Sequence, residues 1–191
     1  VLKDMAKEEG GGDDQEEQYI LSRAKEKTSG LISLIGDLLD LSRIEAGGAV
    51  HNIQKIGLDE LLENIVDFLQ ERARAKKQRL TLELAEDAFP QLTADPLALE
   101  SIFGNLVTNA INYTGEGGHI RVTMDQEDMC LRVKVADDGL GIAPEYQEKI
   151  FEKFYRVKDE NTRFITGTGL GLPIVKGLVE QMMGTIDLES R

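Results

Sequence analysis

The chain has 191 residues, of which 22 are basic and 35 acidic, so its net charge is −13. This acidic excess argues against a protein that binds nucleic acid or an anionic membrane surface, because both partners require basic surface. A hydrophobic fraction of 41% is high enough for a folded core. The length suits one domain with an appendage, or two small domains.

The sequence predicts a protein without a membrane span or a disulfide. The longest uncharged stretch, from Ser101 to Gly115, contains three asparagines and falls short of the ~20 apolar residues that a span needs. We expect no secretory signal at the start of the chain. Cys130 is the only cysteine, which excludes an internal disulfide and favours a reducing, cytoplasmic location.

The first part of the chain predicts a long helix from about residue 15 to residue 45. Its apolar side chains recur at three- and four-residue steps: Ile20, Ala24, Leu31, Leu34, Ile35, Leu38, Leu41 and Ile44. The glycines and aspartates of residues 10–14 predict a break before this helix, and residues 1–9 resemble the end of an earlier one. We therefore expect a partial helical hairpin over residues 1–47, ending at Gly47-Gly48. Its long apolar stripe predicts a homodimer through this hairpin.

Residues 48–191 mix helices and strands without a regular βαβ alternation, which predicts an α+β fold. In chain order we expect a strand near 52–56, a helix with Leu58, Leu61, Leu62, Ile65 and Leu69 on one face, a strand at 80–84, a helix opened by Asp95-Pro96, strands at 119–125 and 129–136, a helix at 170–183 and a last strand near 185–189. Basic residues crowd the end of the first of these helices: Arg72, Arg74, Lys76, Lys77 and Arg79. That pattern favours a solvated face with favourable charge at a helix C-terminus.

The helix opened by Asp95-Pro96 carries three asparagines, Asn105, Asn109 and Asn112, within about 60° of each other on one face. Asparagine is a mediocre helix former, so a stripe of three points to a function. The amide oxygen suits Mg²⁺, the NH₂ group can donate to a phosphate, and a neutral amide does not repel a polyanion. A solvated polar face explains this helix by itself equally well.

Two glycine-rich loops follow. Asp137 ends a strand in phase with its apolar face, so we expect the carboxylate to point inward and accept from a donor such as the amino group of adenine. A tight turn in which Asp137 caps its own backbone is the alternative. The run from Gly167 to Gly171 opens the last helix, where free N–H groups suit phosphate oxygens, although a flexible loop is again possible. Its glycine spacing matches neither the Rossmann fingerprint nor a P-loop. Between the loops, residues 149–163 hold five bases against three acids, which suits an anionic ligand or a solvated loop.

In order and type, these motifs resemble the four boxes of the catalytic, ATP-binding domain of two-component sensor histidine kinases. The N box reads Asn105-Leu-Val-Thr-Asn109-Ala-Ile-Asn112-Tyr113, the G1 box Asp137-Asp-Gly139-Leu-Gly141-Ile142, the F box Phe151-Glu-Lys-Phe154-Tyr-Arg156, and the G2 box Gly167-Thr168-Gly169-Leu170-Gly171-Leu172. The stretch from Leu38 to Gly47 is similar to the end of the second helix of that family's dimerisation hairpin. The resemblance implies a two-layer α/β sandwich of the Bergerat type over residues 48–191.

The resemblance also implies ATP and Mg²⁺ as cofactors. Asn109 would ligate Mg²⁺, Asn105 and Asn112 would contact phosphates, Tyr113 would pack on the adenine, and Asp137 would accept from its amino group. Residues 155–169 would form a mobile lid, with Arg156 and Asn105 acting at the phosphates. The other nucleotide-binding residues would be Gly139, Gly141, Ile142, Phe154, Gly167, Thr168, Gly169, Leu170, Gly171 and Leu172. Asn112 stands where the family often has lysine, which leaves less positive charge there.

One feature of the family is missing, namely its phosphoacceptor histidine on the first hairpin helix. His51 and His119 are the only histidines, and neither is followed by an acid and a helix. We therefore expect the acceptor to lie outside this chain, a truncated last strand, and a response-regulator receiver domain as the next partner. The alternative is an ATP-driven switch or ATPase of the same GHKL superfamily. Those ATPases place a glutamate base four residues before the metal-binding asparagine, and Asn105 at that position disfavours hydrolysis.

Overall fold

The computed structural model describes residues 10–191 except 49, 86–90, 128–129, 158, 161 and 166. The chain divides into two units, one up to Leu39 and one from Asp40 onward, which are treated separately below. The predicted domain boundary after residue 47 stays a prediction. In the described part of the chain, none of the helices combines the length and the apolar character that a membrane-spanning segment needs.

The first unit is formed by helix α1, which runs from Gly10 to Glu45 and extends into the second unit. The predicted break at residues 10–14 is wrong, because the helix includes all of them. Glycine costs only about 1 kcal/mol relative to alanine inside a helix, which the rest of a 36-residue helix can offset. The predicted earlier helix over residues 1–9 lies outside the described residues.

The end of α1 is fixed by backbone hydrogen bonds and belongs to the second unit. Gly47 adopts φ +72°, and its N–H donates to the Ile44 carbonyl at 3.0 Å, while Gly48 N–H donates to the Arg43 carbonyl at 3.0 Å. These bonds make a Schellman motif, which confirms the predicted stop. The Ile44 carbonyl also accepts from Gln181 Nε2 at 2.8 Å, so the last turn of α1 is tied to the C-terminal helix described next.

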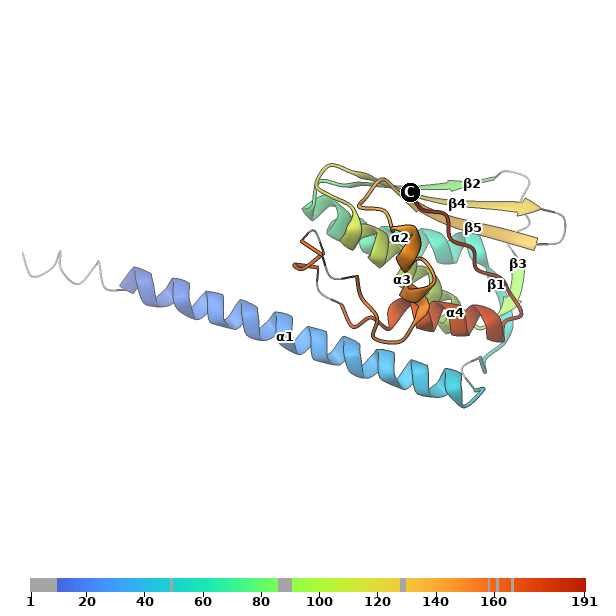
Figure 1. Ribbon diagram of the computed structural model, residues 1–191, viewed down its shortest axis with the longest axis horizontal. Helices are drawn as coiled ribbons and strands as arrows, with labels where there is room; N and C mark the ends of the chain where they lie inside the picture. The colour runs from blue at the N-terminus through green and yellow to red at the C-terminus, as the bar shows by residue number, and fades with distance from the viewer. Residues whose placement is uncertain are drawn as a thin grey trace, which may run out of the picture. The chain divides into compact units, whose positions relative to one another are not determined.

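The second unit has a three-stranded sheet with helices on one face (Figure 1). Its strands are β2 (Arg79–Leu84), β4 (His119–Glu127) and β5 (Cys130–Asp137), with β2 parallel and β5 antiparallel to the central β4. Helices α2 (Leu58–Ala75) and α3 (Pro96–Tyr113) pack on this sheet, and α4 (Gly171–Gln181) packs against α3. A separate antiparallel pair joins β1 (Gln54–Gly57) to β3 (Gln91–Ala94). The predicted α+β class and two-layer arrangement are confirmed.

The core lies between the helices and the sheet. Apolar residues of every layer are fully buried there: Leu62 of α2, Val107 and Ile111 of α3, Ile120 and Val122 of β4, and Ile174 and Val175 of α4. This packing fixes which face α3 turns outward, because the apolar arc of that helix can be buried in one rotational setting only. The asparagine stripe is thereby held in place.

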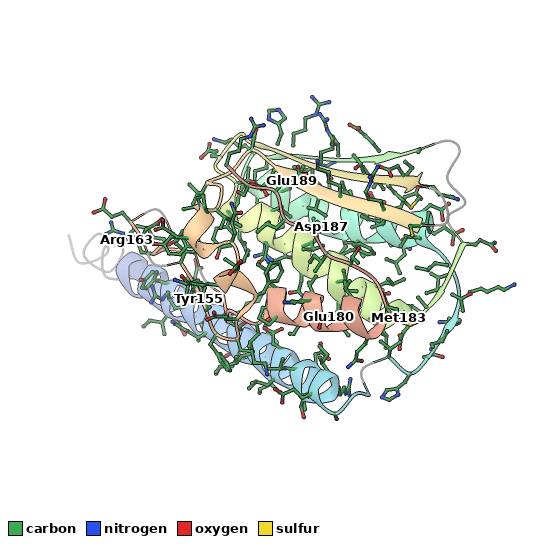
Figure 2. The ribbon with its side chains drawn as sticks, turned by 45° about the vertical axis from the view of Figure 1, so that its right-hand side comes forward. Tyr155, Arg163, Glu180, Met183, Asp187 and Glu189 are labelled. Atoms are coloured by element: carbon green, nitrogen blue, oxygen red, sulfur yellow. The ribbon has the colours of Figure 1, made fainter. Side chains whose placement is uncertain are left out.

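Two predictions about strands differ from the structure. Strand β3 was not expected from the sequence, and the residues near 185–189, expected as a last strand, form none. The segment nevertheless has defined contacts, because Ser190 Oγ accepts from Ile142 N–H at 2.8 Å. Figure 2 follows its path from Glu180 and Met183 past Asp187 to Glu189.

Candidate nucleotide site

The N-box asparagines occupy the middle and the end of α3, whose start is capped by Asp95. Asp95 Oδ1 accepts from Leu97 N–H at 3.0 Å, and proline follows at the first helical position. Asn105, Asn109 and Asn112 are all half-buried on this helix. Asn105 Nδ2 donates to the Ser101 carbonyl at 2.8 Å. Burial without full enclosure leaves these amides available to a ligand.

The G2 box meets the N box at the start of α4. A Cβ on Gly171 would lie 2.8 Å from Asn105 Oδ1, so any other residue here would have to displace the Asn105 side chain. Leu170, just before the helix, is fully buried, and its N–H donates to Thr168 Oγ1 at 3.2 Å. The loop therefore holds the N-terminus of α4 beside Asn105, and the first N–H groups of a helix have no partner within the helix.

The F box meets the same loop. Phe154 N–H donates to the Gly169 carbonyl at 2.9 Å, and a Cβ on Gly169, at φ +74°, would come within 2.9 Å of the Phe154 backbone. Phe154 itself adopts φ +63°, a conformation that costs free energy for a non-glycine residue, and its side chain is exposed. Arg156 Nη1 donates to the Gly167 carbonyl at 3.1 Å, and its Nη2 contacts the Ile165 carbonyl. The guanidinium group of Arg156 thus links the expected lid segment by hydrogen bonds to backbone carbonyls of the same segment.

The G1 box packs against the end of α3. Leu140 N–H donates to the Tyr113 carbonyl at 3.2 Å, and a Cβ on Gly139 would lie 2.5 Å from that carbonyl oxygen. Gly141, at φ +66°, leaves no room for a side chain, because a Cβ there would lie 2.2 Å from the Arg191 carbonyl oxygen. The glycines of this box therefore let the loop approach the helix and the C-terminal segment closely.

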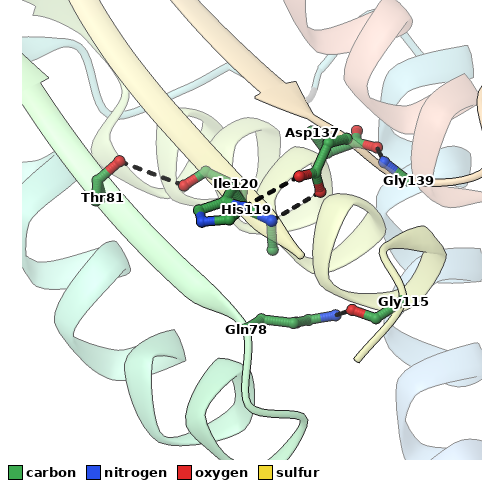
Figure 3. A network of polar contacts seen from close by, with 8 residues as sticks. Gln78, Thr81, Gly115, His119, Ile120, Asp137 and Gly139 are labelled. Carbon is green, nitrogen blue, oxygen red and sulfur yellow. Dashed lines mark hydrogen bonds and ion pairs between the residues drawn. The ribbon is translucent and has the colours of Figure 1, made fainter. Parts of the chain in front are cut away.

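The predicted burial of the Asp137 carboxylate is wrong. Asp137 is exposed, and its Oδ1 accepts from Gly139 N–H at 3.0 Å, which is the alternative of a turn capped by its own side chain (Figure 3). The physical reason is its position, since Asp137 is the last residue of β5 and the chain turns immediately after it. The second carboxylate oxygen of Asp137 is not used in this turn and can accept a hydrogen bond from a ligand.

Neither histidine lies on a helix. His119 begins β4 and is exposed, with its Nδ1 3.1 Å from Asp138 Oδ2 and its N–H donating to Asp138 Oδ1 at 2.7 Å. These bonds, the backbone one first, lower the pKa of the Asp138 carboxyl. His51 is exposed in the segment after α1, where its backbone N–H donates to Asp95 Oδ2 at 3.0 Å. The ring of His119 thus has a local partner in Asp138, and the contact cited for His51 is made by its backbone.

Comparison with known proteins identifies the family. Residues 94–191, just over half of the chain, match the model of the histidine kinase-, DNA gyrase B-, and HSP90-like ATPases. The chain belongs to this ATPase family. It is 36% identical over 174 residues to the sensor protein GacS of Pseudomonas syringae pv. syringae, an alignment that covers 89% of this chain and 19% of that protein. The chain thus spans about a fifth of the length of this curated relative.

Solved structures of histidine kinases are similar to the chain. The full-length kinase ShkA in complex with AMPPNP superposes with a TM-score of 0.71 at 28% identity, over 88% of this chain and 34% of that one. The histidine kinase ThkA in complex with the response regulator TrrA gives a TM-score of 0.66 at 27% identity, over 84% of this chain and 43% of that one. The residues of this ATPase domain can therefore be compared with the groups that a bound nucleotide requires.

The residues of the ATPase domain fit a magnesium nucleotide. Among the described residues, no three His, Cys, Asp or Glu side chains gather as a metal site. The half-buried Asn109 carries an amide oxygen, a hard neutral ligand of the kind that would suit Mg²⁺. Mg²⁺ suits this arrangement, because it keeps water and phosphate oxygens in most of its coordination positions. The helix N-terminus at Gly171 offers N–H donors to phosphates, and the neutral amide of Asn105 beside it does not repel them.

Sequence reasoning missed one polar contact of the N box. Arg72, at the end of α2, donates from Nη2 to Asn112 Oδ1 at 2.9 Å. One turn later, Lys76 Nζ donates to the Ile111 carbonyl at 2.8 Å. Both residues belong to the basic cluster that the sequence assigned to a solvated face. A cross-helix partner could not be inferred from their spacing, because it depends on how α2 and α3 pack.

Proposed function

We propose that the chain is the ATP-binding catalytic part of a sensor histidine kinase, which transfers the γ-phosphoryl group of ATP to a histidine on a dimerisation helix outside this chain. The convergence of the four boxes supports this reading above all. The N box touches G2 through Asn105 and Gly171, G2 touches the F box through Gly169 and Phe154, and G1 closes on the end of the N box at Tyr113.

In this proposal the protein binds and orients the nucleotide, because phosphoryl transfer depends mainly on position and charge neutralisation. Asn109 holds Mg²⁺, which neutralises developing negative charge on the phosphates. Asn105, Asn112 and the amides from Gly167 to Leu172 contact the phosphates, with Arg156 near the terminal one. Asp137 accepts from the adenine amino group, and the remaining adenine contacts come from Tyr113, Gly139, Gly141, Ile142 and Phe154.

The partners follow from the same proposal. The exposed apolar stripe of α1 supports a homodimer formed through the helical hairpin. ThkA was solved with a response regulator, which supports a receiver domain as the protein that takes the phosphoryl group from the histidine. ATP as ligand and a single cysteine support a cytoplasmic location.

Labelling in trans tests the proposed function. The chain is mixed with a separate hairpin polypeptide that carries the acceptor histidine, and with ATP radiolabelled at the γ-phosphate. We expect acid-labile label on the hairpin and none on the chain alone, and we expect Asn109→Asp to abolish both labelling and Mg-ATP binding.

Other outcomes would contradict the proposal. Label on His51 or His119 would refute an acceptor outside the chain. Release of phosphate without labelled hairpin would favour the alternative, an ATP-driven switch or ATPase, which the amide at Asn105 disfavours because it is a poor base for activating water. Unchanged Mg-ATP affinity in Asn109→Asp would refute the metal assignment.

A further inference from the structure

The basic end of α2 contacts the last turn of α3. Arg72 Nη2 lies 2.9 Å from Asn112 Oδ1, and Lys76 Nζ lies 2.8 Å from the Ile111 carbonyl oxygen and 3.5 Å from that of Asn112. Burial and then the positive charge of Arg72 lower the pKa of Lys76. Two cations one helical turn apart are therefore held next to the third asparagine of the stripe.

The hydrogen bond from Arg72 fixes the orientation of the Asn112 amide. A guanidinium group can only donate, so the atom facing Arg72 must be the amide oxygen. The NH₂ group of Asn112 is then left to donate elsewhere. Asn105 is held in the opposite sense, because its NH₂ group donates one hydrogen bond to the Ser101 carbonyl and its oxygen faces Gly171. The two ends of the stripe thus present different atoms, and the end near Arg72 presents the donor that a phosphate oxygen requires.

The charge of Arg72 is also available to a ligand. Lys77, Arg121 and Arg132 each lie within 3.2 Å of a carboxylate oxygen, whereas Arg72 has no carboxylate within ion-pair distance among the described residues. Arg156 has both terminal nitrogens on lid carbonyls. In the described part of the chain, Arg72 is the cationic side chain hydrogen-bonded to an N-box asparagine side chain. It lies outside residues 94–191, which the family model matches.

We propose that Arg72 is a positioning residue of the nucleotide site, which holds the Asn112 amide so that its NH₂ group donates to a phosphate oxygen and which adds positive charge at that phosphate. This inference rests on the proposed function, because it requires a nucleoside triphosphate in the site. It assigns to a residue of α2 a role in binding the phosphates and none in binding the base.

Substitution of Arg72 by glutamine tests the proposal through ligand affinity. The affinities of wild-type protein and Arg72→Gln for Mg-ATP and for adenosine are measured by competition with a fluorescent nucleotide. We expect Mg-ATP to bind about tenfold more weakly to the variant, which corresponds to one charge-assisted hydrogen bond, and adenosine to bind within about twofold of wild type. Arg74→Gln is the matched control, because Arg74 is exposed near the same helix end and has no side-chain partner among the described residues. It should leave both affinities within about twofold.

The dependence on Asn112 separates positioning from an independent contact. We expect Arg72→Gln to weaken Mg-ATP binding by less than about threefold when Asn112 is already alanine, and Arg72→Lys to restore part of the loss. Equal losses for ATP and adenosine would overturn the proposal in favour of a structural role. An unchanged ATP affinity in Arg72→Gln, or a full tenfold loss in the Asn112→Ala background, would also overturn it. Failure of the wild-type protein to bind Mg-ATP would instead refute the proposed function.

Discussion

Helices α1 and α3 have the same kind of sequence pattern and opposite environments. Both repeat apolar residues at three- and four-residue steps, yet on α3 Leu99, Ile102 and Val107 are at most 3% exposed. On α1 the exposed large apolar side chains of residues 19–39 have between 43% and 66% of their surface accessible: Tyr19, Ile20, Leu21, Leu31, Ile32, Ile35, Leu38 and Leu39. Periodicity shows that a helix has a face to bury, and the tertiary structure decides where it is buried.

This difference indicates that the apolar faces of α1 and α3 have different roles. The apolar arc of α3 is buried inside its own unit, and this burial fixes the orientation of the face that carries the asparagines. On α1 the apolar side chains named above are left exposed, whereas Leu41 near the end of the stripe is buried, and a group of exposed apolar side chains is typical of an interface. Substitutions on one helix should therefore leave the property of the other unchanged.

The largest effect is expected for Ile111→Ala on α3. Ile111 is fully buried, so the loss of its side chain should lower the free energy of unfolding by about 3 kcal/mol. The matched variant Ile35→Ala on α1 removes a side chain that is 58% exposed, and it should change the free energy of unfolding by less than about 0.5 kcal/mol. Urea unfolding of dilute, monomeric protein measures both. Similar losses in the two variants would contradict the contrast between the helices.

The next effect concerns self-association. Placing two carboxylates in the stripe with Leu31→Glu and Ile35→Glu should weaken dimerisation about a hundredfold, because both charges would be desolvated in the interface. Sedimentation equilibrium measures the association, and Mg-ATP affinity should stay within about twofold of wild type. Lys25→Glu, an exposed change on the same helix, is the control. A dimer of unchanged strength would show that the stripe is not the interface.

A smaller loss of stability is expected for Asp95→Ala. Asp95 caps α3 through Leu97 and also accepts from His51 and Asn52 N–H, both at 3.0 Å, so its removal should cost about 2 kcal/mol. Burial alone would raise the pKa of this carboxyl, but the backbone hydrogen bonds outweigh it and lower the pKa below its ordinary value of 3.8.

The lowered pKa of Asp95 gives this prediction a pH dependence. The carboxylate contributes fully above its unfolded-state pKa, and the contribution is lost as the pH falls through the lower folded-state value. Thermal unfolding between about pH 5 and pH 2 should therefore show the difference between wild type and Asp95→Ala shrinking with acid. A difference that stays constant over this range would refute the role of the ionised form.

The smallest effect is expected at the end of α1. Gly47→Ala places a side chain at φ +72°, which should cost about 1 kcal/mol without altering either nucleotide affinity or the core of α3. Chemical denaturation measures it, with Gly36→Ala inside α1 as the control that should be neutral or stabilising, because a Cβ there would meet no atom within 4 Å. A neutral Gly47→Ala would mean that the Schellman motif does not limit stability.

The longer elements of the fold could be predicted from the sequence, because their signals are local. Asp95-Pro96 and Gly47-Gly48 marked helix ends through caps that use neighbouring residues. The four residues of β3 carried no such signal, since their conformation depends on pairing with β1, as in Ile56 opposite Leu92. The segment near 185–189 had the composition of a strand, but it makes no ladder in the structure. Pairing between distant segments decides both cases.

The site divides in the same way. The order of the boxes predicted that the asparagines of α3 and the glycines at the start of α4 belong to one site, and the structure brings Asn105 and Gly171 together. The orientation of Asp137 was not predictable, because strand alternation no longer applies at the last residue of a strand. The contact of Arg72 with Asn112 joins residues 40 positions apart and depends on the packing of two helices.

The cap at Asp95 has a consequence for dissecting this protein. The family match begins at residue 94, but Asp95 takes two of its donors from residues 51 and 52, and the central strand β4 pairs on one side with β2. A fragment starting at residue 94 would lose the parallel neighbour of β4, the partner of β3 and the whole of α2. The stretch that the family model matches is therefore shorter than the stretch that must fold together, and cooperative unfolding should include residues from about 51 onward.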